Sequence, residues 1–246
     1  MDRASFPQAP DTCPAPSAQR RRLLRAVAVA TVLGGAAAMP GVARADPLAD
    51  FVRDLPNDDV GAVRQLLRQG LRPDAVDAHG NSALYLALQY RATKVARLLL
   101  AQPGIRLDQP NSVGETPLMI ACLRGENALA EALVARGARV DPSGDAAAWT
   151  PLSYAATGGD DAMVKFLLAH GARVDRPAAN GTTPLMMAAY FGHTAALRSL
   201  LAAGANPRLR NAQGFTAMDL AMQRQHHQTA EALGRALDAG RKPGQW

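Results

Sequence analysis

The chain has 246 residues, of which 48% are hydrophobic and only 4% aromatic, with a formal net charge of +6 and a pI near 9.9. Alanine and leucine must therefore supply most of a core, which favours thin, closely packed helices and argues against a sandwich or barrel. The positive charge would suit a protein that binds nucleic acid, so its distribution along the chain decides whether that class of function stands.

The first 45 residues have the layout of a secretory signal peptide. The basic block QRRRLLR at 19–25 precedes an apolar run of mostly small residues at 26–39, and the segment ends on the small-x-small pattern ARA. The apolar run is too short to span a bilayer, so we expect cleavage between Ala45 and Asp46 and no membrane contact afterwards. The alternative is an uncleaved anchor. Because the basic block also resembles a twin-arginine signal, both that route and the general secretory route stay open.

Removal of this segment would take away six basic and two acidic side chains, which leaves 21 basic and 19 acidic residues and a net charge of +2. The basic pI thus belongs mainly to the export segment, and we expect no nucleic acid partner. Of the two cysteines, Cys13 would leave with the segment and Cys122 would remain alone. We therefore expect a mature chain without an internal disulfide, located in the periplasm or, alternatively, secreted.

The rest of the chain repeats one pattern five times. Each unit opens on a helix N-cap residue, and the spacings are 34, 34, 33 and 33 for Ser82, Thr116, Thr150, Thr183 and Thr216. In three units a proline follows the threonine, at the first helical position, where its missing N–H is not needed. Glycines follow both the first and the second apolar run in the central units, so the pattern predicts pairs of helices joined by polar turns.

The pattern G-x-T-P-L-x-x-A-A, followed by a glycine junction, a leucine pair and Gly-Ala, resembles the ankyrin repeat. The resemblance implies an all-α solenoid of about five helix-turn-helix repeats joined by β-turn or hairpin loops. Terminal units depart from the pattern, with Arg91 and Gln225 in place of the helix-ending glycine. The family's usual histidine after T-P-L is absent, which shifts stability towards packing. Expected segments are the signal peptide 1–45, N-terminal capping helices 46–79, repeats 80–113, 114–147, 148–180 and 181–213, a C-terminal capping repeat 214–238 and a flexible tail 239–246.

Ankyrin repeats usually meet their partners with the hairpin tips and the exposed end of the first helix. Transferred by register, this implies a protein-binding concave groove that includes five aromatic residues, which are typical binding anchors. The alternative is that such aromatics pack over the neighbouring repeat and touch no partner. The expected groove residues are Tyr90, Glu115, Arg124, Trp149, Thr182, Tyr190, Phe191, Phe215 and Arg224.

Catalytic motifs are not apparent in the sequence. There is no G-x-S-x-G, H-E-x-x-H or phosphate-binding glycine loop, and His193 falls at a helix junction that the repeat itself explains. Cys122 replaces a small alanine at a packed position, which predicts a buried, inert thiol. We therefore expect no catalysis, no cofactor and no metal.

The sequence thus predicts a monomeric, non-catalytic scaffold that binds another protein in the bacterial periplasm. Two alternatives remain open. Similar exported ankyrin proteins imply an accessory role for an oxidative-stress enzyme such as a catalase. The other alternative is a secreted effector or an antidote-type protein.

Overall fold

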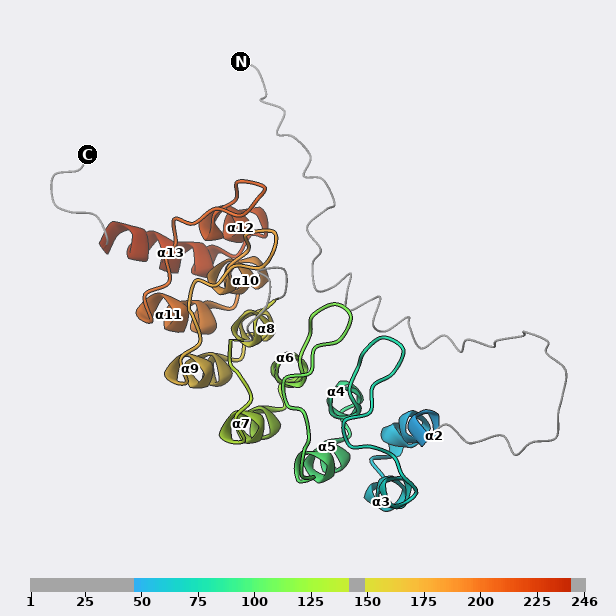
Figure 1. The fold of residues 1–246 in the computed structure, drawn as a ribbon. Coiled ribbons are helices and arrows are strands. Elements are labelled where there is room, and N and C mark those ends of the chain that lie inside the picture. The colour runs from blue at the N-terminus through green and yellow to red at the C-terminus, as the bar shows by residue number, and fades with distance from the viewer. Residues whose placement is uncertain (1–46, 142–148, 240–246) are drawn as a thin grey trace, which may run out of the picture. The chain divides into compact units, whose positions relative to one another are not determined.

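The computed structural model describes residues 47–141 and 149–239; the expected signal peptide, its cleavage point and residues 240–246 lie outside these ranges. The described residues form twelve α-helices and one 3-10 helix, arranged in successive pairs (Figure 1). Within these ranges the only β structure is an isolated antiparallel bridge between Val76 and Ser82. The expected all-α solenoid of helix pairs is confirmed.

The helices form two rows. The elements are α2 (Pro47–Asp54), η1 (Leu55–Asn57), α3 (Val60–Arg68), α4 (Ala83–Gln89), α5 (Thr93–Leu100), α6 (Pro117–Arg124), α7 (Asn127–Ala135), α8 (Pro151–Gly158), α9 (Asp161–Ala169), α10 (Pro184–Phe191), α11 (Thr194–Ala202), α12 (Ala217–Gln223) and α13 (His227–Ala239). The first helices of successive pairs, α4, α6, α8, α10 and α12, each pack against the next, and second helices such as α9, α11 and α13 do the same (Figure 1).

Small side chains let the first helices approach one another. Ala121, Ala155 and Ala188 occupy the same register in α6, α8 and α10, and each has no exposed surface. Leucines and methionines fill the space between the two rows and form one continuous core. Cys122 lies in this core with 1% of its surface exposed, and burial raises the pKa of its thiol, so the expected buried thiol is confirmed.

The N-caps of the first helices form as expected. The residue three positions after each N-cap, where ankyrin repeats usually have histidine, takes part in the caps described here. The Thr116 and Thr183 hydroxyls accept the backbone N–H groups of Met119 and Met186 at 3.5 and 3.3 Å. In return, the Met119 sulfur accepts the Thr116 N–H at 3.3 Å, and Asp219 accepts the corresponding N–H in α12 at 2.8 Å. These side chains therefore satisfy helix-end donors within their own repeat.

The junction between the two helices of a pair requires a left-handed residue. Gly125 and Gly159 end α6 and α8 with φ of 70° and 73°, as expected. The terminal units reach the same conformation without glycine. The residues at these junctions are Asp58, Arg91 and Gln225, with φ of 49°, 60° and 60°. A side chain in this region costs conformational energy that glycine avoids.

Histidine side chains tie the later repeats together. The His193 Nε2–H donates to the carbonyl oxygen of Thr157 in the preceding repeat at 3.0 Å, and His226 does the same to Tyr190 at 3.1 Å. The His193 ring lies directly against Gly159, where an added Cβ would be 2.5 Å from its Nδ1 atom. The glycine is therefore needed both for its backbone conformation and for the space that the ring occupies.

The two ends of the solenoid differ. At the N-terminal end, α2 and α3 precede the first repeat, and the Asp58 carboxylate accepts the N–H groups of Lys94 and Val95 at 3.1 and 2.9 Å. Asp58 thereby caps the start of α5 from the preceding unit. At the C-terminal end, α13 runs to Ala239, which is the first residue of the expected tail. No helix in the described part of the chain has the length and apolar character to cross a membrane.

Candidate protein-binding surface

The nine expected groove residues occupy two kinds of position in the structure. One position lies directly before the N-cap of a first helix, and it holds Glu115, Trp149, Thr182 and Phe215. The other lies at the C-terminal end of a first helix, and it holds Tyr90, Arg124, Tyr190, Phe191 and Arg224. The first position is much more buried than the sequence suggested.

Glu115 is a buried linker between three repeats rather than part of a polar rim. Only 8% of its surface is exposed. Its carboxylate accepts hydrogen bonds from the Tyr85 hydroxyl at 2.7 Å, the Tyr154 hydroxyl at 2.5 Å and the Asn111 amide at 3.2 Å. A buried carboxylate needs such donors to offset its desolvation. The prediction that Glu115 faces a partner is therefore wrong, because a residue next to the N-cap lies between α4 and α8.

The two tyrosine hydroxyls are held in their neutral form. Burial raises the pKa of Tyr85 and of Tyr154 well above the usual value, and the charge of Glu115 and its hydrogen bonds add to this. Arg124, half-buried at the end of α6, acts in the opposite direction on the pKa of Tyr85. We call Tyr85, Asn111, Glu115 and Tyr154 the tyrosine–glutamate network. Sequence reasoning missed both tyrosines. The signal at Tyr154 was a phenol at a register position that holds leucine, isoleucine or methionine in the other repeats.

Thr182 and Trp149 also turn inward. Thr182 exposes 3% of its surface, and its hydroxyl is buried without a hydrogen-bond partner among the described residues, so its expected role as a contact residue is wrong. The Trp149 ring is half-buried, with its centroid 6.0 Å from that of Tyr154. Trp149 therefore packs against the tyrosine–glutamate network.

The end of α10 and the end of α12 bring a second group of predicted residues together. The Tyr190 and Phe191 rings meet edge to face with centroids 5.0 Å apart. The Arg224 guanidinium lies 4.5 Å from the centroid of the Tyr190 ring. The Phe191 and His193 rings are stacked, with their centroids 6.1 Å apart. Both aromatic rings are half-exposed. These four residues, named the aromatic cluster below, form a preformed cation–π and aromatic surface.

The remaining two aromatics stand apart from this cluster. Tyr90 is 36% exposed at the end of α4, and in the described part of the chain no ring contact joins it to the other predicted aromatics. Phe215 is half-buried and packs against the core. The five predicted aromatics therefore do not form one continuous patch.

The true hairpin tips lie before the glycine rather than after it. The Asn111 side-chain oxygen accepts the N–H groups of Val113 and Glu115 at 3.1 and 2.9 Å, which fixes the turn and leaves Val113 63% exposed. Asn211 holds the exposed Gln213 in the same way. The N-x-x-G pattern was the missed signal, since an Asn side chain bonds the backbone two residues on and leaves the intervening side chains outside.

Two ankyrin-repeat family models match the sequence, one described as ankyrin repeats (3 copies) over residues 104–178 and the other as ankyrin repeats (many copies) over residues 167–221.

In the described residues, no three histidine, cysteine or acidic side chains gather in a way that could hold a metal ion. Among the curated proteins, none matches this sequence significantly.

Solved structures from two bacteria are similar to the chain. One is a chain in the complex of a predatory endopeptidase from Bdellovibrio bacteriovorus with an immunity protein, with a TM-score of 0.65 and 27% identity, covering 76% of this chain and 97% of that one. The other is an ankyrin repeat domain from Acinetobacter baumannii AYE, with a TM-score of 0.64 and 26% identity, covering 76% and 96%. Residues 104–221 thus match ankyrin-repeat models, and the paired helices, their N-caps and the similar solved structures show that the described residues fold as an ankyrin-repeat solenoid.

Proposed function

We propose that the chain is a non-catalytic scaffold that binds another protein through the aromatic cluster. Ankyrin repeats form a protein–protein interaction fold, and the exposed ends of α10 and α12 are the place where this chain presents aromatic and guanidinium groups together. Tyrosine and arginine are the residue types that most often dominate the binding energy of an interface. The half-exposed Tyr190 ring beneath Arg224 is the observation that carries the proposal.

The scaffold would bind with little ordering cost. Tyr190 and Phe191 belong to a helix with a full N-cap, and His226 holds the Tyr190 carbonyl from the next repeat. Because these side chains are already positioned, a partner would not need to order a loop before contact. Loss of the Arg224–Tyr190 pair should therefore weaken binding without changing the fold.

The test is affinity capture from a periplasmic extract, with the protein immobilised. The test variant carries Tyr190→Ala and Arg224→Ala, and the control carries Arg198→Ala, an exposed residue of the neighbouring second helix α11. Circular dichroism and a urea titration establish that both variants are folded. We expect the same protein to be retained by the parent and the control, with retention reduced about tenfold or more for the test variant. Equal retention by all three would reject the aromatic cluster as the binding site.

We place the scaffold in the periplasm. The support is the order of a basic block, an apolar run and a small-x-small pattern in residues 1–45, which lie outside the described residues. Mass spectrometry of the N-terminus, performed on cell fractions, tests this location. A chain that begins at Asp46 in the periplasmic fraction supports it, an intact chain in the cytoplasm contradicts it, and recovery from the medium favours the secreted alternative.

A second candidate is an antidote-type role in which the partner is an endopeptidase. The observation that favours it is the similarity to a chain in the complex of an endopeptidase with its immunity protein. The test is to purify the exported endopeptidases of the same cell and to measure their activity with and without the protein. Stoichiometric inhibition that the Tyr190→Ala and Arg224→Ala variant loses would support this role, and unchanged activity of every endopeptidase would reject it.

A further inference from the structure

The segment 60–107, which contains α3 and α5, carries an excess of positive charge, whereas the segment just before it is acidic and holds Asp50, Asp54, Asp58 and Asp59. Between residues 60 and 107 the sequence has seven basic and two acidic side chains, a net charge of +5, whereas the whole segment 46–246 has a net charge of only +2. Both acidic residues, Asp74 and Asp77, lie in the loop before α4, so α3 and α5 carry no acidic side chain. The basic charge of these two helices is therefore not neutralised within them.

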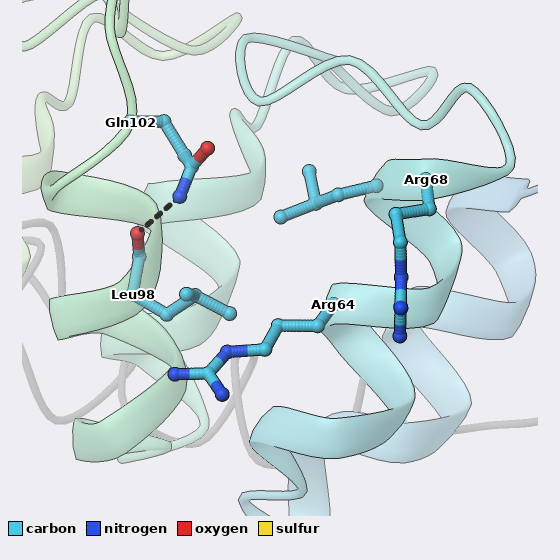
Figure 2. A pocket seen from close by; sticks show the side chains of 5 residues that line it. Arg64, Arg68, Leu98 and Gln102 are labelled. Atoms are coloured by element: carbon cyan, nitrogen blue, oxygen red, sulfur yellow. Dashed lines mark hydrogen bonds between the residues drawn. The ribbon is translucent and has the colours of Figure 1, made fainter.

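A pocket of about 460 Å³ opens between α3 and α5. Leu67 of α3 and Leu98 of α5 provide its apolar lining, and both are half-buried. Figure 2 shows Arg64 reaching from α3 towards Leu98, with Arg68 one turn along the same helix. Gln102 closes another side, where its amide Nε2–H donates to the Leu98 carbonyl oxygen at 3.1 Å.

The two arginines of the pocket are exposed and available. Neither Arg64 nor Arg68 makes a hydrogen bond or an ion pair with any residue in the described ranges, in contrast to Arg72, which pairs with Asp74 at 3.0 Å. Residues four apart on a helix project from the same face, with Cβ atoms about 6 Å apart. Two guanidinium groups at that spacing match two carboxylates one helical turn apart. Each guanidinium can donate two parallel hydrogen bonds, and each carboxylate can accept them.

We propose that this pocket is a second docking site, for an acidic amphipathic helix of a partner protein that inserts a leucine-sized side chain between Leu67 and Leu98. Two carboxylates of that helix pair with Arg64 and Arg68. Lys94, exposed one turn before Leu98 on α5, lies on the same side of its helix, where the Asp58 carboxylate accepts its backbone N–H at 3.1 Å. The site belongs to the second helices of the solenoid, so it is independent of the aromatic cluster on the first helices.

The shape of the pocket favours a protein segment over a lipid surface. Membrane association needs a protruding apolar face in addition to basic residues. Leu67 and Leu98 are instead recessed, and neither belongs to the exposed large hydrophobic residues of the described chain. A recess with a charged rim receives single side chains from outside, which is how a helix docks in a groove.

The experiment measures the binding of fluorescent peptides to the full-length protein by anisotropy, at low and at physiological salt. A panel of capped helical peptides carries one leucine at varied positions and two glutamates three or four residues apart. Matched peptides replace the glutamates with glutamine or the leucine with serine. The test variant carries Arg64→Gln and Arg68→Gln, and the control carries Arg136→Gln and Arg198→Gln, which remove the same charge from exposed positions elsewhere.

We expect peptides with both the leucine and the glutamates to bind, with affinity reduced about tenfold or more in the test variant and unchanged in the control. Three results would overturn the proposal. One is that no member of the panel binds. Another is an equal loss of affinity in both variants, which would indicate general charge attraction. The third is that phosphatidylglycerol vesicles bind through Arg64 and Arg68 while the peptides do not, which would assign the site to membranes.

Discussion

The contact between Gly159 and His193 leads to a sharp prediction about stability. Gly159 ends α8 with φ of 73°, and the His193 ring of the next repeat lies against it. In the variant Gly159→Ala the new Cβ would stand 2.5 Å from Nδ1 of the ring, and Cβ atoms essentially never approach another heavy atom closer than 3.0 Å. The ring must therefore move, and its 3.0 Å hydrogen bond to the Thr157 carbonyl breaks.

The expected cost has two parts that other variants can separate. Alanine in the left-handed region costs about 1–2 kcal/mol relative to glycine. The lost hydrogen bond between repeats costs about 1 kcal/mol more, before any repacking of the ring. We expect Gly159→Ala to lower the free energy of unfolding by about 2–4 kcal/mol. Gly125→Ala should cost only the first part, because a Cβ at Gly125, with φ of 70°, meets no neighbouring atom within 4 Å.

Urea unfolding followed by circular dichroism measures these differences, provided that the m value stays constant, since repeat proteins can unfold in parts. The matched cycle adds His193→Ala. In that background the ring is gone, so Gly159→Ala should cost no more than Gly125→Ala does in the parent. The reasoning fails if the two glycine variants are equally destabilised in the parent, or if His193→Ala does not reduce the effect at Gly159.

Further predictions concern the terminal repeat and the tyrosine–glutamate network. Gln225→Gly should stabilise the protein by about 0.5–1 kcal/mol in urea unfolding, because Gln225 has φ of 60°; an unchanged or lower midpoint would contradict this. Tyr154→Phe should destabilise it by about 1–2 kcal/mol, since Glu115 loses a buried donor, and a neutral effect would show that water replaces the hydroxyl. The raised pKa values of Tyr85 and Tyr154 contribute stability below about pH 10 that is lost as the pH rises further. Ultraviolet absorbance against pH should therefore show these phenols ionising only as the chain unfolds, and early ionisation without unfolding would contradict the assignment.

The sequence was sufficient for features that depend on neighbours a few residues apart. Thr116 caps α6 and Gly125 ends it, and both roles follow from local backbone chemistry. The recurrence of these signals at a fixed spacing then predicts the stacking, because each repeat must cover the apolar face of the next. The same register identified Arg91 and Gln225 as substitutes for glycine, and both adopt its conformation.

The direction of a side chain between repeats could not be obtained in this way. Glu115 is 30 residues from Tyr85 and 39 from Tyr154, and its burial depends on how α4, α6 and α8 are spaced. Local chemistry marks Glu115 as a polar loop residue, for which exposure is the ordinary expectation. The pocket between Leu67 and Leu98 could not be predicted for the same reason, since one wall comes from α3 in the N-terminal segment and the other from α5 in the first repeat.

The two candidate surfaces differ in how their polar groups are used. In the first three repeats the phenols of Tyr85 and Tyr154 stabilise Glu115 internally, whereas Arg64 and Arg68 on the other helix row line an open pocket and have no side-chain partner among the described residues. In the last two repeats backbone carbonyls and histidines link the units, so the Tyr190 ring remains half-exposed beneath Arg224. The same variants can therefore distinguish one bivalent partner from two separate ones. A single partner that contacts both surfaces would lose affinity with changes at either, whereas two partners would respond to one change each.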